Sequence, residues 1–157
     1  IISPGMRLGW LVADREIINK MLIAKEASDL HSSQFSQKII FQYLTDYNLD
    51  EHLYKIRNGY SAQKELMIQS IKKYFPDRVL FTDPQGGMFI WVTLPDDVDS
   101  FKILEVAAKR KVIFVPGGIF YIDNIRNNTM RLNFSNSKSD QIEDGIRGLG
   151  EILGTAL

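Results

Sequence analysis

The chain has 157 residues, 45% of them hydrophobic, and its 19 basic side chains balance 19 acidic ones. These values are typical of one globular domain, or of one domain plus part of another, and exclude a disordered chain. A nucleic-acid partner and an anionic membrane surface are disfavoured because both select a basic excess. The chain has no cysteine and two histidines, so we expect no disulfide, no thiolate nucleophile and no metal site.

Neither the interior nor the start of the chain carries a membrane signal. No apolar run approaches the roughly 18 residues that a spanning helix needs, and no basic start precedes a short apolar stretch. The opening Ile1-Ile2-Ser3-Pro4-Gly5 is typical of the middle of a loop. We therefore expect an N-terminal part of the protein to precede Ile1.

The first 50 residues predict one strand and two helices. Residues 7–13 are a short, mostly apolar run, which predicts a buried strand. Asp14 is a candidate N-cap for a helix that ends near Ala27-Ser28, and a polar connection over 29–33 follows. The second helix carries its apolar residues at helical spacing, and these are Phe35, Ile39, Tyr43 and Leu44.

A long helix is predicted over residues 49–75, which contain no proline and a single glycine. About 26 residues at about 1.5 Å each would span about 39 Å. A helix of that length in a small protein usually bridges two bodies. Pro76-Asp77 ends it, because proline cannot continue a helix.

Beyond residue 76 the pattern predicts a small sheet with two helices. Strand-like runs lie at 79–81, 88–92, 112–115 and 130–134. Asp99 or Ser100 can cap the first of these helices. The last helix begins within 137–140, where Asp140 and Glu143 have capping-box spacing. Its predicted buried stripe consists of Ile142, Ile146, Leu149 and Leu153.

The order of elements predicts an α/β fold that ends in a small α+β domain, a sheet covered by helices. Residues 1–50 have no partner for their single strand and look like part of a different body. We therefore divide the chain into a remnant of a larger domain (1–50), a connecting helix (51–75) and a small α+β domain (76–157).

Two arginines interrupt the apolar runs and are the leading candidates for a binding site. Arg7 and Arg131 each lie in a predicted strand, where a guanidinium needs an anionic partner. Arginine is well suited to bidentate binding of carboxylate or phosphate. An internal salt bridge, or an edge position facing solvent, explains the same pattern. The pairs Gly86-Gly87 and Gly117-Gly118 are likewise either simple turns or places where a ligand approaches the backbone.

Four segments together resemble the fold-type-I pyridoxal-phosphate aminotransferases, and most of all the branch acting on 2-aminoadipate, kynurenine and aromatic amino acids. Residues 1–10 resemble the segment that follows the Schiff-base lysine in that family. The other three occur in the family's order, and they are Gly86-Gly87-Met88-Phe89-Ile90-Trp91, Val115-Pro116-Gly117 with Phe120-Tyr121, and Arg131-Leu132-Asn133-Phe134-Ser135. The resemblance covers essentially the whole chain.

The resemblance implies roles for individual residues. Arg7 matches the arginine that pairs with the phosphate of the cofactor, pyridoxal 5'-phosphate, and Arg131 matches the arginine that binds the substrate α-carboxylate. The loop with His31, Ser32 and Ser33 matches a segment that reaches toward the neighbouring subunit's site in the family's homodimers. An ordinary loop is the alternative for His31. The family also implies a cytoplasmic protein that acts on amino acids and 2-oxo acids.

The Schiff-base lysine of the family should stand just before Ile1, so we expect no catalytic residue within this chain and no activity of the chain alone. We expect the chain to be the C-terminal small domain of an aminotransferase fold, together with the last strand and helices of the large cofactor-binding domain. A second hypothesis belongs to another class of protein. Some bacterial regulators fuse a DNA-binding winged helix to an aminotransferase-like effector domain.

Overall fold

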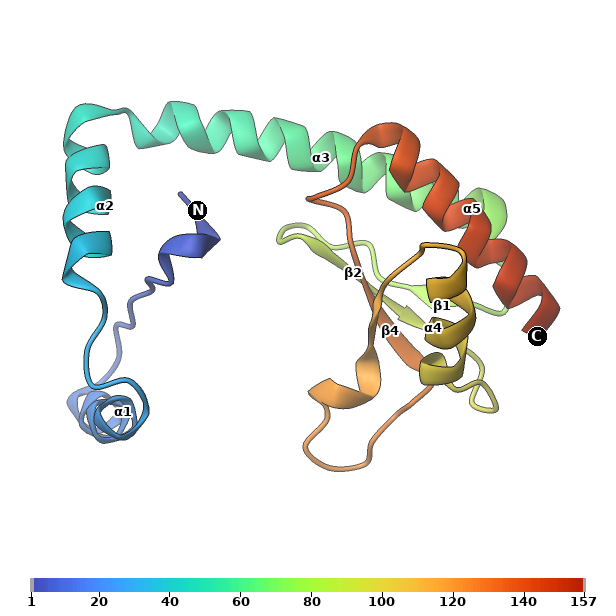
Figure 1. Cartoon of the computed structure of the whole chain (residues 1–157), viewed down its shortest axis with the longest axis horizontal. Helices are drawn as coiled ribbons and strands as arrows, with labels where there is room; N and C mark the ends of the chain where they lie inside the picture. Colours follow the sequence, from blue (N-terminus) through green and yellow to red (C-terminus); the bar gives the residue numbers. More distant parts are fainter. Residues whose placement is uncertain (1, 157) are drawn as a thin grey trace. The chain divides into compact units, whose positions relative to one another are not determined.

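The computed structural model describes residues 2–156, which form two compact units that divide between Lys55 and Ile56. Ile1, the first residue of the aminotransferase-like motif, lies outside the described residues, as does Leu157. The division falls within one long helix, α3 (Leu49–Tyr74). In Figure 1 the first unit is drawn in blue to cyan, and the second runs from green through yellow and orange to red.

The first unit is helical. It contains a short 3₁₀ turn (Pro4–Met6), α1 (Arg15–Ser28) and α2 (Gln34–Asp46), followed by the first turns of α3. The two predicted helices are confirmed. Ser33 caps α2, since its Oγ accepts a hydrogen bond from the backbone N–H of Ser36 at 3.3 Å. No residue described between 2 and 55 is buried.

The predicted strand over residues 7–13 is wrong, because this segment is extended but pairs with no other strand among the described residues. A strand is stable only when a neighbour takes up its backbone hydrogen bonds, and the first unit supplies none. Trp10 is 84% exposed, so the segment is not buried either. Asp14 does occupy the N-cap position of α1, but its side chain forms no capping hydrogen bond.

The second unit is built on an antiparallel four-stranded sheet in the order β1-β2-β4-β3. Its strands are β1 (Leu80–Phe81), β2 (Phe89–Thr93), β3 (Val115–Pro116) and β4 (Thr129–Asn133). The central pair is β2 and β4, with Trp91 opposite Arg131. The antiparallel sheet confirms the expected small α+β architecture.

One face of the sheet forms the core with α3, α4 (Ser100–Lys109) and α5 (Ser139–Ala156). Ile90, Val92 and Met130 project from this face and have no exposed area. The predicted stripe of α5 is buried as expected. α5 lies along the C-terminal half of α3 (Figure 1), where Gly150 is in contact with the carbonyl group of Tyr74. A side chain at Gly150 would separate the two helices.

Two local expectations in the second unit are wrong. The strand predicted at 112–115 is reduced to Val115–Pro116, because the N–H of Val112 instead bonds the carbonyl of Ala107 at 3.0 Å and closes the end of α4. Lys111 takes the left-handed conformation (φ 62°) that this ending requires and that glycine usually supplies.

The second wrong expectation concerns the start of α5, where Asp140 and Glu143 form no capping box. The carboxylate of Glu143 instead accepts a hydrogen bond from the hydroxyl of Tyr74 at 2.8 Å. The Gln141 side chain caps the helix, since its Oε1 accepts from the backbone N–H of Lys138 at 3.1 Å.

Candidate functional site

Arg131 lies at the centre of β4, on the face of the sheet opposite the helical core. Its direct cross-strand neighbours are Trp91 on β2 and Val115 on β3. Side chains alternate between the two faces along a strand, so Arg131 projects away from its buried neighbours Met130 and Leu132. The alternation of the sequence therefore places one half-buried guanidinium in the middle of an otherwise apolar sheet.

The guanidinium of Arg131 is held between two aromatic rings. Its Cζ lies 4.0 Å from the ring centre of Phe89 and 4.6 Å from that of Phe120. Both distances are well within the range of a cation–π interaction. The Nε atom is buried and has no hydrogen-bond partner. An arginine in this state favours binding of an anion, because a partly buried positive charge is stabilised by a negatively charged partner and this one has none among residues 2–156.

The salt-bridge alternative for Arg131 finds no support within residues 2–156, where no carboxylate forms an ion pair with it. The same holds for Arg7 in that range. Internal salt bridges of the second unit are made by other side chains, such as Arg110 with Glu151 at 2.9 Å. Both predicted anion-binding arginines therefore lack an acidic partner among the described residues 2–156.

Arg7 is exposed and ends the 3₁₀ turn Pro4–Met6. It has the left-handed backbone conformation (φ 55°), and its N–H donates to the carbonyl of Pro4 at 3.2 Å. Pro4 favours this turn because its ring presets φ at the first position. Arg7 belongs to the first unit and Arg131 to the second.

The loop with His31, Ser32 and Ser33 joins α1 to α2 and is held by its own hydrogen bonds. The Nδ1 of His31 lies 3.2 Å from the carbonyl oxygen of Ser32, and Lys25 Nζ donates to Ser32 Oγ at 3.3 Å. Ser33 caps α2. The ring of His31 is exposed. The three side chains thus already have local structural roles, and the suggested role at a neighbouring subunit's site remains a prediction.

The two glycine pairs differ. A Cβ at Gly117 would collide with Thr129, and one at Gly118 would lie 2.6 Å from Asn127 Oδ1. This pair serves close internal packing, so it leaves no room for a ligand at the backbone. Gly86 and Gly87 have open space where a Cβ would stand, and Gly87 has a φ of 82° that favours glycine.

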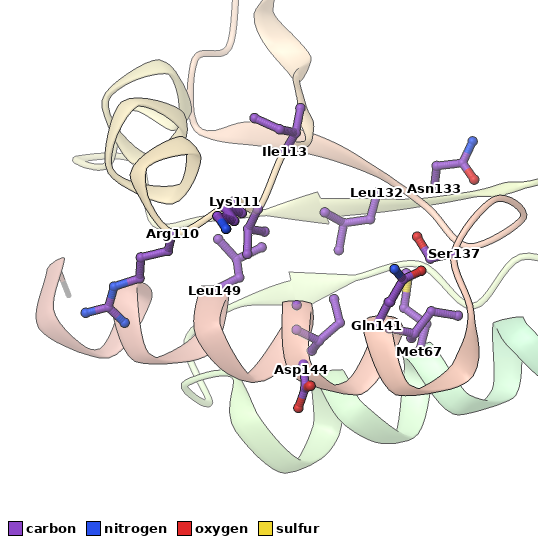
Figure 2. Close-up of a pocket in the computed structure, with 14 residues that line it drawn as sticks. Met67, Arg110, Lys111, Ile113, Leu132, Asn133, Ser137, Gln141, Asp144 and Leu149 are labelled. Carbon is purple, nitrogen blue, oxygen red and sulfur yellow. The ribbon is translucent and has the colours of Figure 1, made fainter.

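A hollow of the second unit lies elsewhere, with a volume of about 590 Å³ between α5, the end of α4 and β4. Figure 2 shows its lining, which includes Arg110 and Asp144 but not Arg131. Arg110 pairs with Glu151, and Asp144 accepts a hydrogen bond from Arg147 at 2.6 Å. Two of its charged groups are therefore already paired, and none of the segments that resemble the aminotransferases contributes an arginine to this hollow.

Phe89 and Phe120 were not predicted as site residues, although both occur in the segments that resemble the aminotransferases. Their place beside Arg131 depends on the β2–β4 register and on the turn that follows β3. The sequence signal that could have found Phe89 is an aromatic residue two positions from the one opposite the arginine. No such signal points to Phe120, which lies in the turn after β3.

The chain belongs to the aminotransferase class I and II family, whose model matches residues 2–149. Aromatic-amino-acid aminotransferase 1 of Thermococcus litoralis is 39% identical over 98% of this chain. The structure of a kynurenine aminotransferase of Pyrococcus horikoshii, solved with PMP and with KYN as substrate, is 44% identical over 98% of this chain, with a TM-score of 0.86. The chain spans 37% and 38% of the lengths of these two proteins.

A relative of another class also matches. The HTH-type transcriptional regulator NorG of Staphylococcus aureus is 28% identical over 92% of this chain, which spans 32% of the regulator's length. The helices and the four-stranded sheet thus match the C-terminal portion of an aminotransferase, a portion that enzymes and a regulator share.

No helix within residues 2–156 is long and apolar enough to cross a bilayer. In that same range, no three histidine, aspartate or glutamate side chains converge as metal ligands would.

Proposed function

We propose that this chain forms the carboxylate-binding part of a pyridoxal-phosphate-dependent aminotransferase, which transfers an amino group from an amino acid to a 2-oxo acid. The observation that carries the proposal is the state of Arg131. It is half-buried, forms cation–π contacts with two rings and has no acidic partner in residues 2–156. Membership of the aminotransferase family supports it.

Arg131 would bind the α-carboxylate of the substrate through two parallel N–H···O bonds. Such a fork fixes both the position and the orientation of a carboxylate. An amino acid held in this way presents its amino group at a constant place, which lowers the entropic cost of the reaction. The same fork would bind the carboxylate of the 2-oxo acid that receives the amino group.

Arg7 would bind the phosphate of the cofactor. Its guanidinium is exposed and has no acidic partner in residues 2–156, so it fits a phosphate as one cation of a larger donor set. When bound, pyridoxal phosphate supplies an electron sink for chemistry at the α-carbon. No lysine in residues 2–156 stands at the position that the family motif requires. We propose that the chain alone does not catalyse the transfer.

Further features of the enzyme are proposed on the resemblance alone. They are the homodimer, a contribution of His31, Ser32 and Ser33 to the partner's site, a cytoplasmic location, and a preference among 2-aminoadipate, kynurenine and aromatic substrates. The division into a cofactor-domain remnant with its helices (1–50), a connecting helix (51–75) and a small domain (76–157) belongs here as well.

The test is the steady-state kinetics of a full-length aminotransferase that carries this chain as its C-terminal part, assayed with an aromatic donor and 2-oxoglutarate. Arg131→Ala should raise the amino-acid KM sharply, by about tenfold to a hundredfold, because a charge-assisted pair is lost. Arg131→Lys keeps the positive charge but loses the two-pronged donor geometry, so its amino-acid KM should lie between those of the wild type and Arg131→Ala. An unchanged KM in Arg131→Ala would remove the assigned role.

The second candidate function is that of an effector-binding domain in a DNA-binding regulator, favoured by the match to NorG. Arg131 would then bind a carboxylate effector without turnover. The two functions separate in one experiment on the full-length protein. Transfer of nitrogen to 2-oxoglutarate supports the enzyme, whereas effector-dependent DNA binding without transfer supports the regulator.

A further inference from the structure

Two aromatic side chains contact the Arg131 guanidinium and two more extend the group, and the four come from two segments. Phe89 and Trp91 lie on β2, whereas Phe120 and Tyr121 lie at the end of the 3₁₀ turn η2 (Gly117–Phe120) and just after it. Trp91 packs edge-on against Phe120, with ring centres 5.8 Å apart, and lies 6.3 Å from Tyr121. Phe120 therefore links the two groups, because it contacts Trp91 and also shares the Arg131 cation with Phe89.

We propose that Phe89 and Phe120 are positioning residues, which hold the Arg131 guanidinium by its two faces so that its edge remains free to bind a carboxylate. This inference deepens the proposed function and rests on it. The central carbon of the Arg131 guanidinium lies over both rings, whereas the N–H groups of a guanidinium point outward in its plane. An acidic partner would use the same in-plane donors as the ligand. Aromatic partners do not compete for them.

The burial of Arg131 supports this division of roles. Its Nε is buried without a hydrogen bond, so the side chain has not been stabilised by polar neighbours. A cation–π contact is stronger where the cation is partly withdrawn from water, as it is at the buried Nε end of this half-buried side chain. The two rings thus offset part of the cost of desolvation and keep the fork in one orientation before the ligand arrives.

The position of Phe120 depends on the glycines that precede it. Gly117 approaches Thr129 so closely that no side chain fits between them, and Gly118 is packed against Asn127 and the ring of Phe101. The N–H of Tyr121 donates to the carbonyl of Gly118 at 3.3 Å and closes the turn. The pair Gly117-Gly118 therefore sets the turn against β4, and the turn sets the ring of Phe120 on Arg131.

Phe120 is the better of the two rings to test, because it is 46% exposed and lies outside the hydrophobic core. Phe120→Leu removes the ring but keeps an apolar side chain of similar size. Phe120→Tyr keeps a ring and should behave as the wild type. Ile119→Ala is the matched control, because Ile119 lies on the same turn and is exposed. Neither cation–π contact of Arg131 involves Ile119.

The experiment is an NMR titration of the ¹⁵N-labelled 157-residue chain with sodium acetate, against sodium chloride at equal ionic strength. Acetate has a carboxylate and no aromatic ring, so any change in its affinity cannot come from stacking of the ligand on Phe120. Two quantities are read from the Nε–H signal of Arg131, assigned with Arg131→Lys. They are its upfield ring-current shift in the free protein and the acetate dissociation constant.

The inference predicts that Phe120→Leu reduces the upfield shift and weakens acetate binding by about three- to thirtyfold. Phe120→Tyr and Ile119→Ala should retain both. Equal acetate affinity in the wild type and in Phe120→Leu overturns the positioning role. A wild type that shows the upfield shift but does not respond to acetate contradicts carboxylate binding by Arg131, and so the proposed function, while leaving the stacking itself confirmed.

Discussion

The two units of this chain are similarly rich in apolar residues, but only one of them uses these residues to build a core. Every buried hydrophobic side chain lies between Met67 and Leu153. Between residues 2 and 55 none is buried, and Val12 is 89% exposed and Phe35 74% exposed. Apolar composition therefore does not by itself produce a core. A sheet or a second layer of helices must be present to receive the apolar faces.

The contrast also separates two sources of helix stability. α1 and α2 have 14 and 13 residues, lengths at which an isolated helix is marginal in water. α5 is longer, with 18 residues, and its apolar stripe is more sharply confined to one face, which is buried in the core that the sheet and α3 also form. We expect the second unit to be the more stable part of the chain, since tertiary packing supplies most of a helix's stability.

A pair of leucine substitutions tests this contrast with the largest expected effect. Leu149→Ala should lower the free energy of unfolding of the second unit by about 2–5 kcal/mol, because the side chain is fully buried. Leu22→Ala in α1, where the side chain is 52% exposed, should change it by no more than about 0.5 kcal/mol. Denaturant unfolding measures both values.

Amide hydrogen exchange on the wild type sharpens the same comparison. Amides of α5 should be protected to the level of global unfolding, and those of α1 should exchange much faster. Equal protection of α1 and α5 would contradict the contrast, and it would show that the apolar residues of the first unit are covered by a partner such as a second copy of the chain.

Two glycines of α5 offer a matched test of smaller size. Gly150→Ala should destabilise the second unit by about 1–3 kcal/mol, because the new Cβ meets the Tyr74 carbonyl of α3. Gly154→Ala, four residues on and in open space, should stabilise it by about 0.5–1 kcal/mol through helix propensity. Thermal unfolding measures the shift. Equal effects at the two positions would mean that α3 and α5 are not packed at Gly150.

The smallest predicted effect is electrostatic and lies on the surface of the same helix pair. The hydroxyl of Tyr74 and the ammonium of Lys73 donate to Glu143 and lower the pKa of its carboxyl group. Because the carboxyl pKa is lower in the folded state, the ionised Glu143 stabilises the folded state at pH values above the unfolded-state pKa. This contribution is lost as the pH falls through the folded-state pKa. Tyr74→Phe should therefore raise the pKa of Glu143 toward its ordinary value.

A ¹³C titration of the Glu143 carboxyl group measures that shift. Lys73→Gln is the companion variant and should also raise the pKa, but less, because the tyrosine hydrogen bond is the larger cause. A Glu143 pKa that stays the same in Tyr74→Phe would show that the hydroxyl does not bond the carboxylate in solution.

Much of the fold could be predicted because local signals coincide with the final structure. Pro76 follows α3 by two residues, and the side chain of Asp99 accepts the N–H of Phe101 at 2.8 Å as an N-cap should. Expectations failed where a distant partner decided the outcome. Residues 7–13 found no neighbouring strand, and Glu143 bonds Tyr74, 69 positions away, in place of its own helix end.

The candidate site divides in the same way. Arg131 could be singled out as a charge within an apolar strand, since such a charge needs an explanation wherever it lies. Its surroundings could not be predicted, because Phe120 is brought to it by a turn 11 positions earlier in the chain. That turn is set by the contact of Gly117 with Thr129.

The sequence by itself determined the helices, the approximate strands and the presence of two unexplained arginines, since periodicity, caps and breakers act over a few residues. Only the tertiary structure decided which apolar residues are buried, which strand-like segment remains unpaired and which rings hold Arg131. The reason is physical: burial, strand pairing and stacking each require two segments to meet, and the meeting is a property of the whole fold.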